Sequence, residues 1–281
     1  MTDTSLEGLT HLPDQVSFQT ALERTTHLGI GAHPDDLEIM AYHGIEQCYQ
    51  SAEKWFAGMT VTNGSGSSRT GPYADFTDAQ MVEIRHKEQV AVADIGQYSF
   101  ITQLGLTSAD LKEADCSLHQ QIASLLRMTK PEVLYLHQPL DKHPTHLHLL
   151  RHCLKALRSL SSEELPVQIY GCEVWRGLDW CPEPFKIALD VSTHPDLALE
   201  LIRAHDSQIS GGKRYDLATL GRRIANATYD DPRESDQSQS LIWAIDLKPL
   251  VLDHSLTLES YAESVLETFQ AEVKAGLKEI G

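Results

Sequence analysis

The feature that most constrains this chain is a His-Pro-Asp-Asp sequence directly after a short apolar run. The run covers 27–30, and the residues Gly-Ala-His-Pro-Asp-Asp-Leu-Glu follow it. This order places His33, Asp35 and Asp36 in a turn at the end of an expected strand. One imidazole and two adjacent carboxylates at a strand end predict a site that binds a metal or moves protons.

A second polar cluster follows a later apolar run, 133–137. Its side chains are Asp141, His143 and His146, with proline after the first histidine. Open α/β folds gather their ligands at the carboxyl ends of parallel strands. We therefore expect the two clusters to meet at one edge of a sheet and to form a mononuclear metal site.

Short apolar runs alternate with longer amphipathic segments, which is the βαβ pattern of an α/β protein. We expect a Rossmann-like, mostly parallel sheet flanked by helices, in a single domain covering 1–281. Two polar segments, 63–73 and 226–240, are expected to be loops, and the second a mobile one. The expected strands are 27–32, 55–62, 133–137, 167–174 and 185–189; the expected helices are 37–50, 77–97, 108–128, 144–160, 193–208 and 260–278.

The composition limits the classes of molecule that we expect this protein to bind. The chain has 281 residues and a formal net charge of -17, which disfavours nucleic acid and anionic membrane surfaces and suits a small neutral substrate. Its five cysteines are scattered without a C-x-x-C pair, so we expect a reducing compartment and no disulfide framework. The first residues lack a signal-peptide pattern, and no apolar run approaches the ~20 residues of a membrane span. We expect a cytoplasmic protein.

The two clusters supply what a hydrolytic metal site needs. A catalytic zinc site uses three protein ligands of the imidazole and carboxylate kind and leaves one position for water. Two adjacent residues in a turn do not easily reach the same metal, so if Asp36 is a ligand then Asp35 is free to act as general base. A metal lowers the pKa of its water to roughly 7, within reach of such a base. His143 would approach from the other side, to stabilise an oxyanion or to protonate the leaving group.

These residues resemble the motifs of the LmbE-like/PIG-L zinc de-N-acetylases. The matching patterns are A-H-P-D-D-x-E after the first strand and D-x-H-P-x-H later. The resemblance implies that His33, Asp36 and His146 bind zinc, that Asp35 is the general base and that His143 assists the transition state. It also implies an LmbE-like fold.

The resemblance covers about 27–210 and leaves 211–281 as a C-terminal extension. Arg85 begins a segment similar to the family's R-x-x-E helix, and His205 lies in one similar to its H-x-S-Q helix end. With Asp141, these two residues are the expected substrate contacts. Thr145 departs from the family pattern, which commonly has Asp there, and this affects how the ligands are oriented more than the chemistry.

Simpler interpretations compete at several positions. A lone His-Pro-Asp-Asp sequence also suits a helix N-cap, since carboxylates are favourable there. Asp141 either orients a histidine or only shapes its turn. His148 and His152 share a helix face at i, i+4, which we interpret as a packing or solvated face.

Other pocket features are equally open. Gly64 and Gly66 either let a ligand approach the backbone or only form a turn. Three aromatic residues are candidates for stacking on a sugar ring, although at least one of them is expected in the core. They are Trp175, Trp180 and Tyr215.

The resemblance thus implies a hydrolase that removes the acetyl group from an N-acetylglucosamine-type sugar, with Zn²⁺ as cofactor. The same ligands suit Fe²⁺ and other divalent transition metals. Two alternatives stay open: a metallo-amidase or esterase with a non-sugar acyl substrate, and a silent metal-containing sugar-binding protein. A homo-oligomer is compatible with the sequence.

Overall fold

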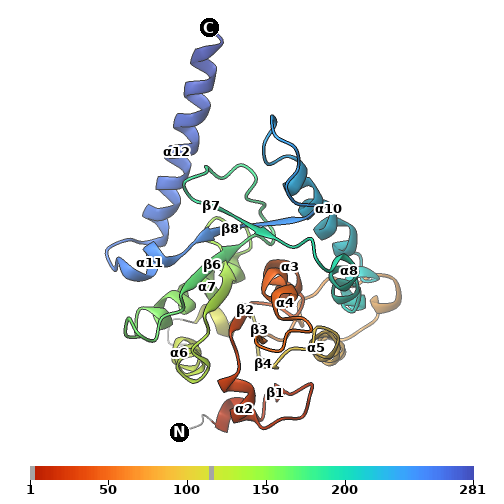
Figure 1. Cartoon of the computed structure of the whole chain (residues 1–281). Helices are drawn as coiled ribbons and strands as arrows, with labels where there is room; N and C mark the ends of the chain where they lie inside the picture. The colour runs from red at the N-terminus through yellow and green to blue at the C-terminus, as the bar shows by residue number, and fades with distance from the viewer. Residues whose placement is uncertain (1–3, 114–116) are drawn as a thin grey trace.

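Within residues 4–113 and 117–281, which the computed structural model describes, the chain forms an eight-stranded sheet with helices on both faces (Figure 1). The strand order is β1-β4-β3-β2-β5-β6-β8-β7. The five strands from β4 to β6 are parallel, whereas β1, β8 and β7 pair antiparallel with their neighbours. The strands are β1 (Thr10–His11), β2 (His27–Gly31), β3 (Phe56–Thr62), β4 (Phe100–Leu106), β5 (Val133–His137), β6 (Gln168–Cys172), β7 (Lys186–Asp190) and β8 (Leu241–Asp246).

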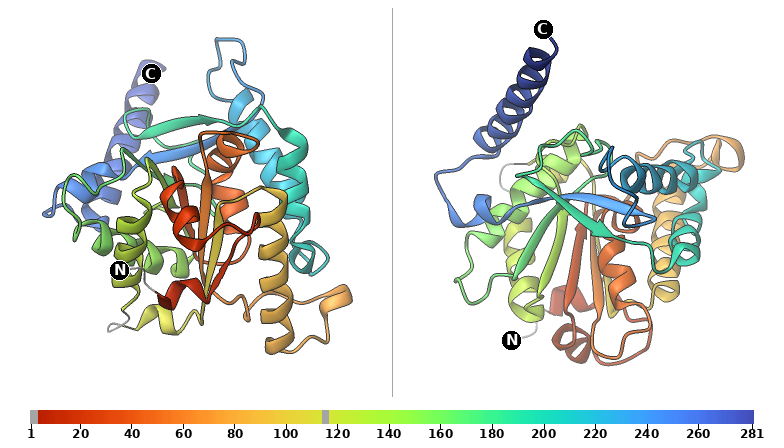
Figure 2. Two further views of the ribbon diagram at one scale, coloured as in Figure 1. Left: turned by 60° about the horizontal axis from the view of Figure 1, so that its bottom comes forward. Right: turned by 45° about the horizontal axis from the view of Figure 1, so that its top comes forward.

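The helices lie in two layers that each bury an apolar face against the sheet. One layer contains α2, α6 and α7, and the other contains α3, α4, α8 and the end of α5. The α-helices are α1 (Thr4–Glu7), α2 (Phe18–Glu23), α3 (Asp36–Met40), α4 (Tyr42–Cys48), α5 (Asp78–Ile95), α6 (Leu118–Thr129), α7 (Pro144–Leu157), α8 (Pro195–Arg203), α9 (Asp206–Ile209), α10 (Tyr215–Thr228), α11 (Lys248–Leu252) and α12 (Leu258–Glu279). The last of these projects from the body and carries the C-terminus (Figure 2).

The centre of the sheet sets the position of the polar clusters. Every residue of β2, β3 and β5 is buried, which is typical of parallel strands covered on both faces. Strand β2 pairs in parallel with β3 on one side and with β5 on the other. After β2, the chain adds β3 and β4 on one side of this strand and then crosses to its other side to form β5. The direction in which strands are added therefore reverses between β2 and β5. A ligand crevice is expected at the carboxyl ends of two such strands.

The expected fold class is confirmed, but two of the expected helices are divided. The helix expected over 37–50 breaks at Ala41 into α3 and α4. The guanidinium of Arg223 donates to the backbone carbonyls of Glu38 and Ile39, at 2.7 and 3.2 Å, and these carbonyls would otherwise accept the next helical hydrogen bonds. The helix expected over 193–208 breaks at 204–205 into α8 and α9.

Other boundaries also differ from the expectation. The segment 108–128 does not form one helix: a 3-10 turn occupies Asp110–Lys112, and α6 starts only at Leu118. The expected elements do not include strands β1, β4 and β8 or helices α1, α2, α10 and α11, and α10 covers the start of the expected loop 226–240. Strand β8 adds residues 241–246 of the C-terminal extension to the sheet.

Four cysteines lie in the described part of the chain and are free and buried: Cys48, Cys153, Cys172 and Cys181. Cys116 lies outside it. No helix in residues 4–113 and 117–281 has the length and apolar character needed to cross a membrane.

Candidate functional site

The first polar cluster lies between β2 and α3. Asp36 is the first residue of α3, where a carboxylate suits the positive end of the helix dipole. Its Oδ2 accepts the backbone N–H of His33 at 2.7 Å and lies 3.1 Å from Nδ1 of the same histidine. The turn therefore fixes both side chains close together, with Asp36 buried and His33 partly exposed.

The second cluster lies between β5 and α7. His143 is the N-cap of α7 and Pro144 its first residue, so His146 comes one turn into the helix. Asp141 Oδ2 lies 3.0 Å from Nδ1 of the buried His146, and its Oδ1 accepts the backbone N–H groups of Lys142 and His143. Asp141 thus both orients the histidine and shapes the turn. If Asp141 holds the proton on Nδ1, the lone pair of His146 is on Nε2.

The two clusters meet, and three of their donor atoms form a compact triangle. Nδ1 of His33 is 3.1 Å from Oδ2 of Asp36 and 3.2 Å from Nε2 of His146; the third side, from Nε2 to Oδ2, is 3.4 Å. Ligands at 2.0–2.1 Å from a tetrahedral zinc are about 3.3–3.4 Å apart. The triangle therefore has the dimensions of one face of a zinc site.

Two more histidines lie close enough to be considered as ligands. His143 forms a group with His33 and His146, and His137 forms one with Asp36 and His146. Nε2 of His137 already accepts the backbone N–H of Ala32 at 3.0 Å, so its lone pair is occupied. Nδ1 of His143 accepts the N–H of Thr145 at 3.3 Å, which leaves Nε2 to carry the proton and to act as a donor.

Asp35 stands apart from the triangle in an unusual backbone conformation. Its φ of 101° lies in the left-handed region, where a residue other than glycine costs about 1–3 kcal/mol. An oxygen of its carboxylate lies 3.3 Å from Nη2 of Arg85, and the same nitrogen donates to the carbonyl of Pro34. Arg85 thus holds both the backbone and the side chain of this turn.

Below Asp35, a buried hydrogen-bond network reaches Glu38. The N–H of Asp35 donates to Oε1 of Gln89 at 3.2 Å, so the amide group of Gln89 must face Glu38, which it contacts at 3.1 Å. Tyr98 donates to the same carboxylate at 2.8 Å, and His205 Nε2 lies 2.9 Å from its other oxygen. Glu38 and Gln89 are fully buried. The network ties the strained turn to α5 and to the residues just before β4 and α9.

This network changes the interpretation of two expected substrate contacts. His205 is buried against Glu38, and Asp141 is buried against His146; neither lines the pocket. Arg85 does line it. Of the remaining histidines, His152 is buried against the carbonyl of Leu111, and neither it nor His148 lines the pocket.

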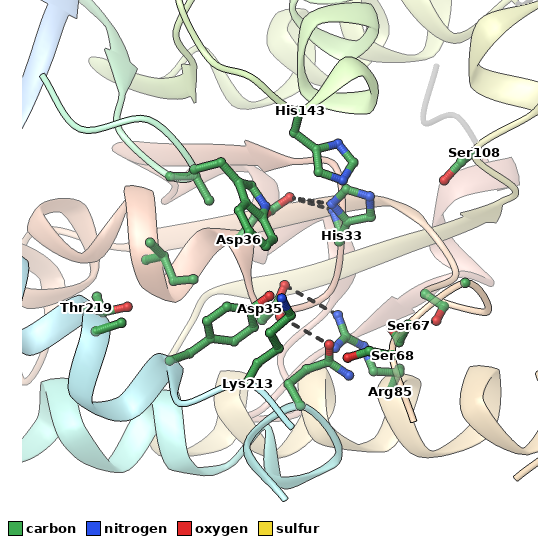
Figure 3. Close-up of a pocket in the computed structure, with 18 of the residues that line it drawn as sticks. His33, Asp35, Asp36, Ser67, Ser68, Arg85, Ser108, His143, Lys213 and Thr219 are labelled. Carbon is green, nitrogen blue, oxygen red and sulfur yellow. Dashed lines mark hydrogen bonds and ion pairs between the residues drawn. The ribbon is translucent and has the colours of Figure 1, made fainter. Parts of the chain in front are cut away.

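A pocket of about 490 Å³ opens over the triangle (Figure 3). The expected residues in its wall are His33, Asp35, Asp36, Arg85, His143, Gly64, Gly66, Trp175 and Tyr215; residues not expected there include Asn63, Ser65, Ser67, Ser68, Gln208, Lys213 and Arg222. Trp180 instead contacts Phe269 of α12. The chain thus brings two members of the triangle, His33 and Asp36, to one cavity together with the Asp35 carboxylate and His143, while His146 is buried behind the cavity wall.

The charges of the site are strongly coupled. Burial would lower the pKa of His146, but Asp36 and Asp141 outweigh it and raise that pKa to about 9. Burial would raise the pKa of Asp36, yet the charges of His146 and His33 hold it well below its usual range. Burial and the charge of His146 lower the pKa of His143 to about 4, so His143 is neutral at pH 7.

Residues 28–157 match the sequence profile of the PIG-L family, described as GlcNAc-PI de-N-acetylase. This segment is similar to the PIG-L (LmbE-like) family. It contains the whole triangle together with Asp35 and His143. No curated protein matches the sequence significantly.

Solved structures share the fold at low sequence identity. The N,N'-diacetylchitobiose deacetylase of Pyrococcus horikoshii is 14% identical over 90% of this chain and 95% of its own, with a TM-score of 0.63. The 4-carboxy-2-hydroxymuconate hydratase GalB of Pseudomonas putida is 18% identical over 80% and 97%, with a TM-score of 0.62. The zinc-inhibited form of teicoplanin deacetylase Orf2 is 16% identical over 79% and 98%, with a TM-score of 0.54.

We predict that zinc displaces a proton from His146. With a pKa of about 9, this side chain is protonated at pH 7.5 in the metal-free protein, whereas a ligand must be neutral. Calorimetric titration in buffers of different ionisation enthalpy should show at least one proton released per zinc, and affinity should fall as pH falls below 9. The variant His148→Gln, changed in the same helix, should release as many protons as the wild type; no release from either protein contradicts the assignment.

The Gln89–Glu38 contact predicts that exchanging the two side chains restores part of the stability and turnover lost in a single variant. Gln89→Glu places two carboxylates together in a buried position, which should cost about 3–5 kcal/mol of unfolding free energy and strongly reduce turnover. The double variant Glu38→Gln, Gln89→Glu restores one donor and one acceptor between the two positions and should recover part of both, since the Tyr98 hydroxyl must then turn to accept from the new amide group at position 38 instead of donating. Urea denaturation and initial rates measure this. A double variant no better than Gln89→Glu alone would contradict the network.

Proposed function

We propose that this protein is a zinc-dependent N-deacetylase acting on an N-acetylglucosamine-type sugar or conjugate. The observation that carries the proposal is the triangle of His33, Asp36 and His146, with the Asp35 carboxylate outside the triangle, paired with Arg85 and facing the same pocket as His33 and Asp36. The family match supports amide cleavage. The structural neighbours include a hydratase as well as deacetylases, so the fold alone does not decide the reaction.

In this proposal His33, Asp36 and His146 hold the metal. Bound there, zinc would polarise the amide carbonyl and lower the pKa of water to about 7. The same donor set accepts Fe²⁺ and other divalent transition metals.

The residues of the chain account for the proton movements. Asp35 takes a proton from the attacking water, since its carboxylate is held by Arg85 and not by the triangle. His143 is neutral and has Nε2–H as its donor, which favours a hydrogen bond to the oxygen of the tetrahedral intermediate over a role as initial acid. The proton on Asp35 then passes to the leaving amine, giving acetate and a free amino sugar.

Trp175 and Tyr215 support a sugar substrate. Both line the pocket, with ring centroids 6.3 Å apart in an edge-to-face arrangement. An apolar ring face beside hydroxyl-bearing residues suits a pyranose, which has an apolar face and a polar edge.

We likewise propose that the whole chain, 1–281, acts as one deacetylase domain in the cytoplasm.

Asp35→Asn tests the mechanism. It retains the size of the side chain but removes the base, so acetate release from N-acetylated sugars should fall about 10²–10⁴-fold. Zinc content, measured by atomic emission, should stay near one per chain, whereas His146→Gln should lose zinc as well as activity. Wild-type rates in Asp35→Asn would exclude it as the base. A stoichiometric metal with no acetate from any sugar would instead favour a non-sugar acyl substrate or a binding protein.

A further inference from the structure

The charged side chains in the pocket do not balance one another. Asp36 belongs to the triangle, and Asp35 is paired with Arg85. Arg222 donates to the backbone carbonyl of Val174. Lys213 also lines the pocket, but it forms no ion pair with any residue in the described ranges.

The backbone and an aromatic ring fix the position of Lys213. Its N–H donates to the carbonyl of Gln208 at 2.9 Å, and its own carbonyl accepts the N–H of Tyr215 at 2.8 Å. Its ammonium nitrogen lies 5.2 Å from the ring centroid of Trp175, within the range of a cation–π contact. The side chain is partly buried, and Figure 3 shows it on the same side of the pocket as Asp35, Arg85, Ser67 and Ser68.

The Gly/Ser-rich segment 63–68 lines the same pocket as Lys213. A Cβ on Gly211, two residues before Lys213, would lie 3.3 Å from the carbonyl oxygen of Ser68, so the two loops pack closely. Ser65 and Ser68 line the pocket, and their hydroxyls make no hydrogen bond to another described residue. Nε of Arg85 is buried and has no hydrogen-bond partner among the described residues, and a Cβ on Gly64 would lie 3.0 Å from it. Unused donors therefore line the same pocket as Lys213.

An anion is the ligand that this arrangement lacks. A partly desolvated ammonium without a counter-ion is unfavourable, and nearby hydroxyl donors add to the attraction for negative charge. The chain as a whole carries a charge of -17, so this local excess of cations is unlike the rest of the protein. A neutral N-acetyl sugar would leave the excess unmatched.

Resting on the deacetylase function proposed above, we propose that Lys213 with Ser65 and Ser68 forms a subsite for an anionic group of the substrate. The group is a carboxylate or a phosphate on the sugar or its conjugate, on the part that leaves with the amine. Lys213 thus determines specificity and takes no part in bond cleavage. If it only balanced the charge of Asp35 and Asp36, its removal would affect charged and neutral substrates alike.

The test compares substrates that differ in charge. Acetate release is measured with N-acetylglucosamine, its 6-phosphate and N-acetylmuramic acid, for wild type, Lys213→Gln, Lys213→Arg and the control Lys155→Gln on the exposed face of α7. We expect kcat/KM of the wild type to be at least tenfold higher for one charged substrate. Lys213→Gln should lose about tenfold for it and less than twofold for the neutral sugar. Lys213→Arg should retain part of the preference, and the control all of it. The preferred substrate distinguishes phosphate from carboxylate.

A binding measurement separates this proposal from the proposed reaction. Glucosamine 6-phosphate, muramic acid and glucosamine are titrated calorimetrically into wild type and Lys213→Gln, with and without zinc. A Lys213-dependent preference for a charged ligand, also without zinc, supports the subsite even if no acetate is released from any sugar. Equal binding of charged and neutral ligands by the wild type, or a preference unchanged in Lys213→Gln, overturns it.

Discussion

The parallel pairing of β2 with β5 is the contact on which the site depends. These strands are distant in sequence, yet they pair from His27 with Val133 to Gly29 with Tyr135, and both are buried on both faces. The two polar turns that follow these strands therefore lie at the same edge of the sheet. The N–H of Ala32 donates to His137 and links these ends directly. A shift of this register would separate His146 from His33 and Asp36.

The site lowers the stability of the fold, and hydrogen bonds from the surrounding residues offset this loss. Asp35 has left-handed backbone, and Glu38, Asp36 and His146 are buried polar groups. Each is held by partners from other elements: Arg85 and Gln89 from α5, Asp141 before α7, and His205 before α9. Buried polar groups are tolerated when their hydrogen bonds are made, and such networks also restrict movement. Residues far from the pocket wall thus keep the triangle and the separate carboxylate in place.

The fold class and most strands of the central sheet could be predicted from the sequence, because a buried strand and its turn are visible locally as an apolar run followed by turn residues. The sequence also indicated His33, Asp36 and His146 as a group. It did not predict the break at Ala41, since this depends on Arg223, distant in the chain. It could not place His205 beneath the pocket or Lys213 within it, because a lone polar residue carries no periodic signal. Strand β8, an apolar run after a polar loop, was recognisable but missed.

The most direct test of the account is the position of a bound metal. Crystals soaked with zinc, measured on both sides of the zinc absorption edge, give the anomalous density of the ion. The account predicts one strong peak about 2.0–2.1 Å from Nδ1 of His33, Oδ2 of Asp36 and Nε2 of His146. Asp35 should stay beyond bonding distance, paired with Arg85. A peak within bonding distance of Asp35 or His137, or no peak at this edge of the sheet, would contradict the account.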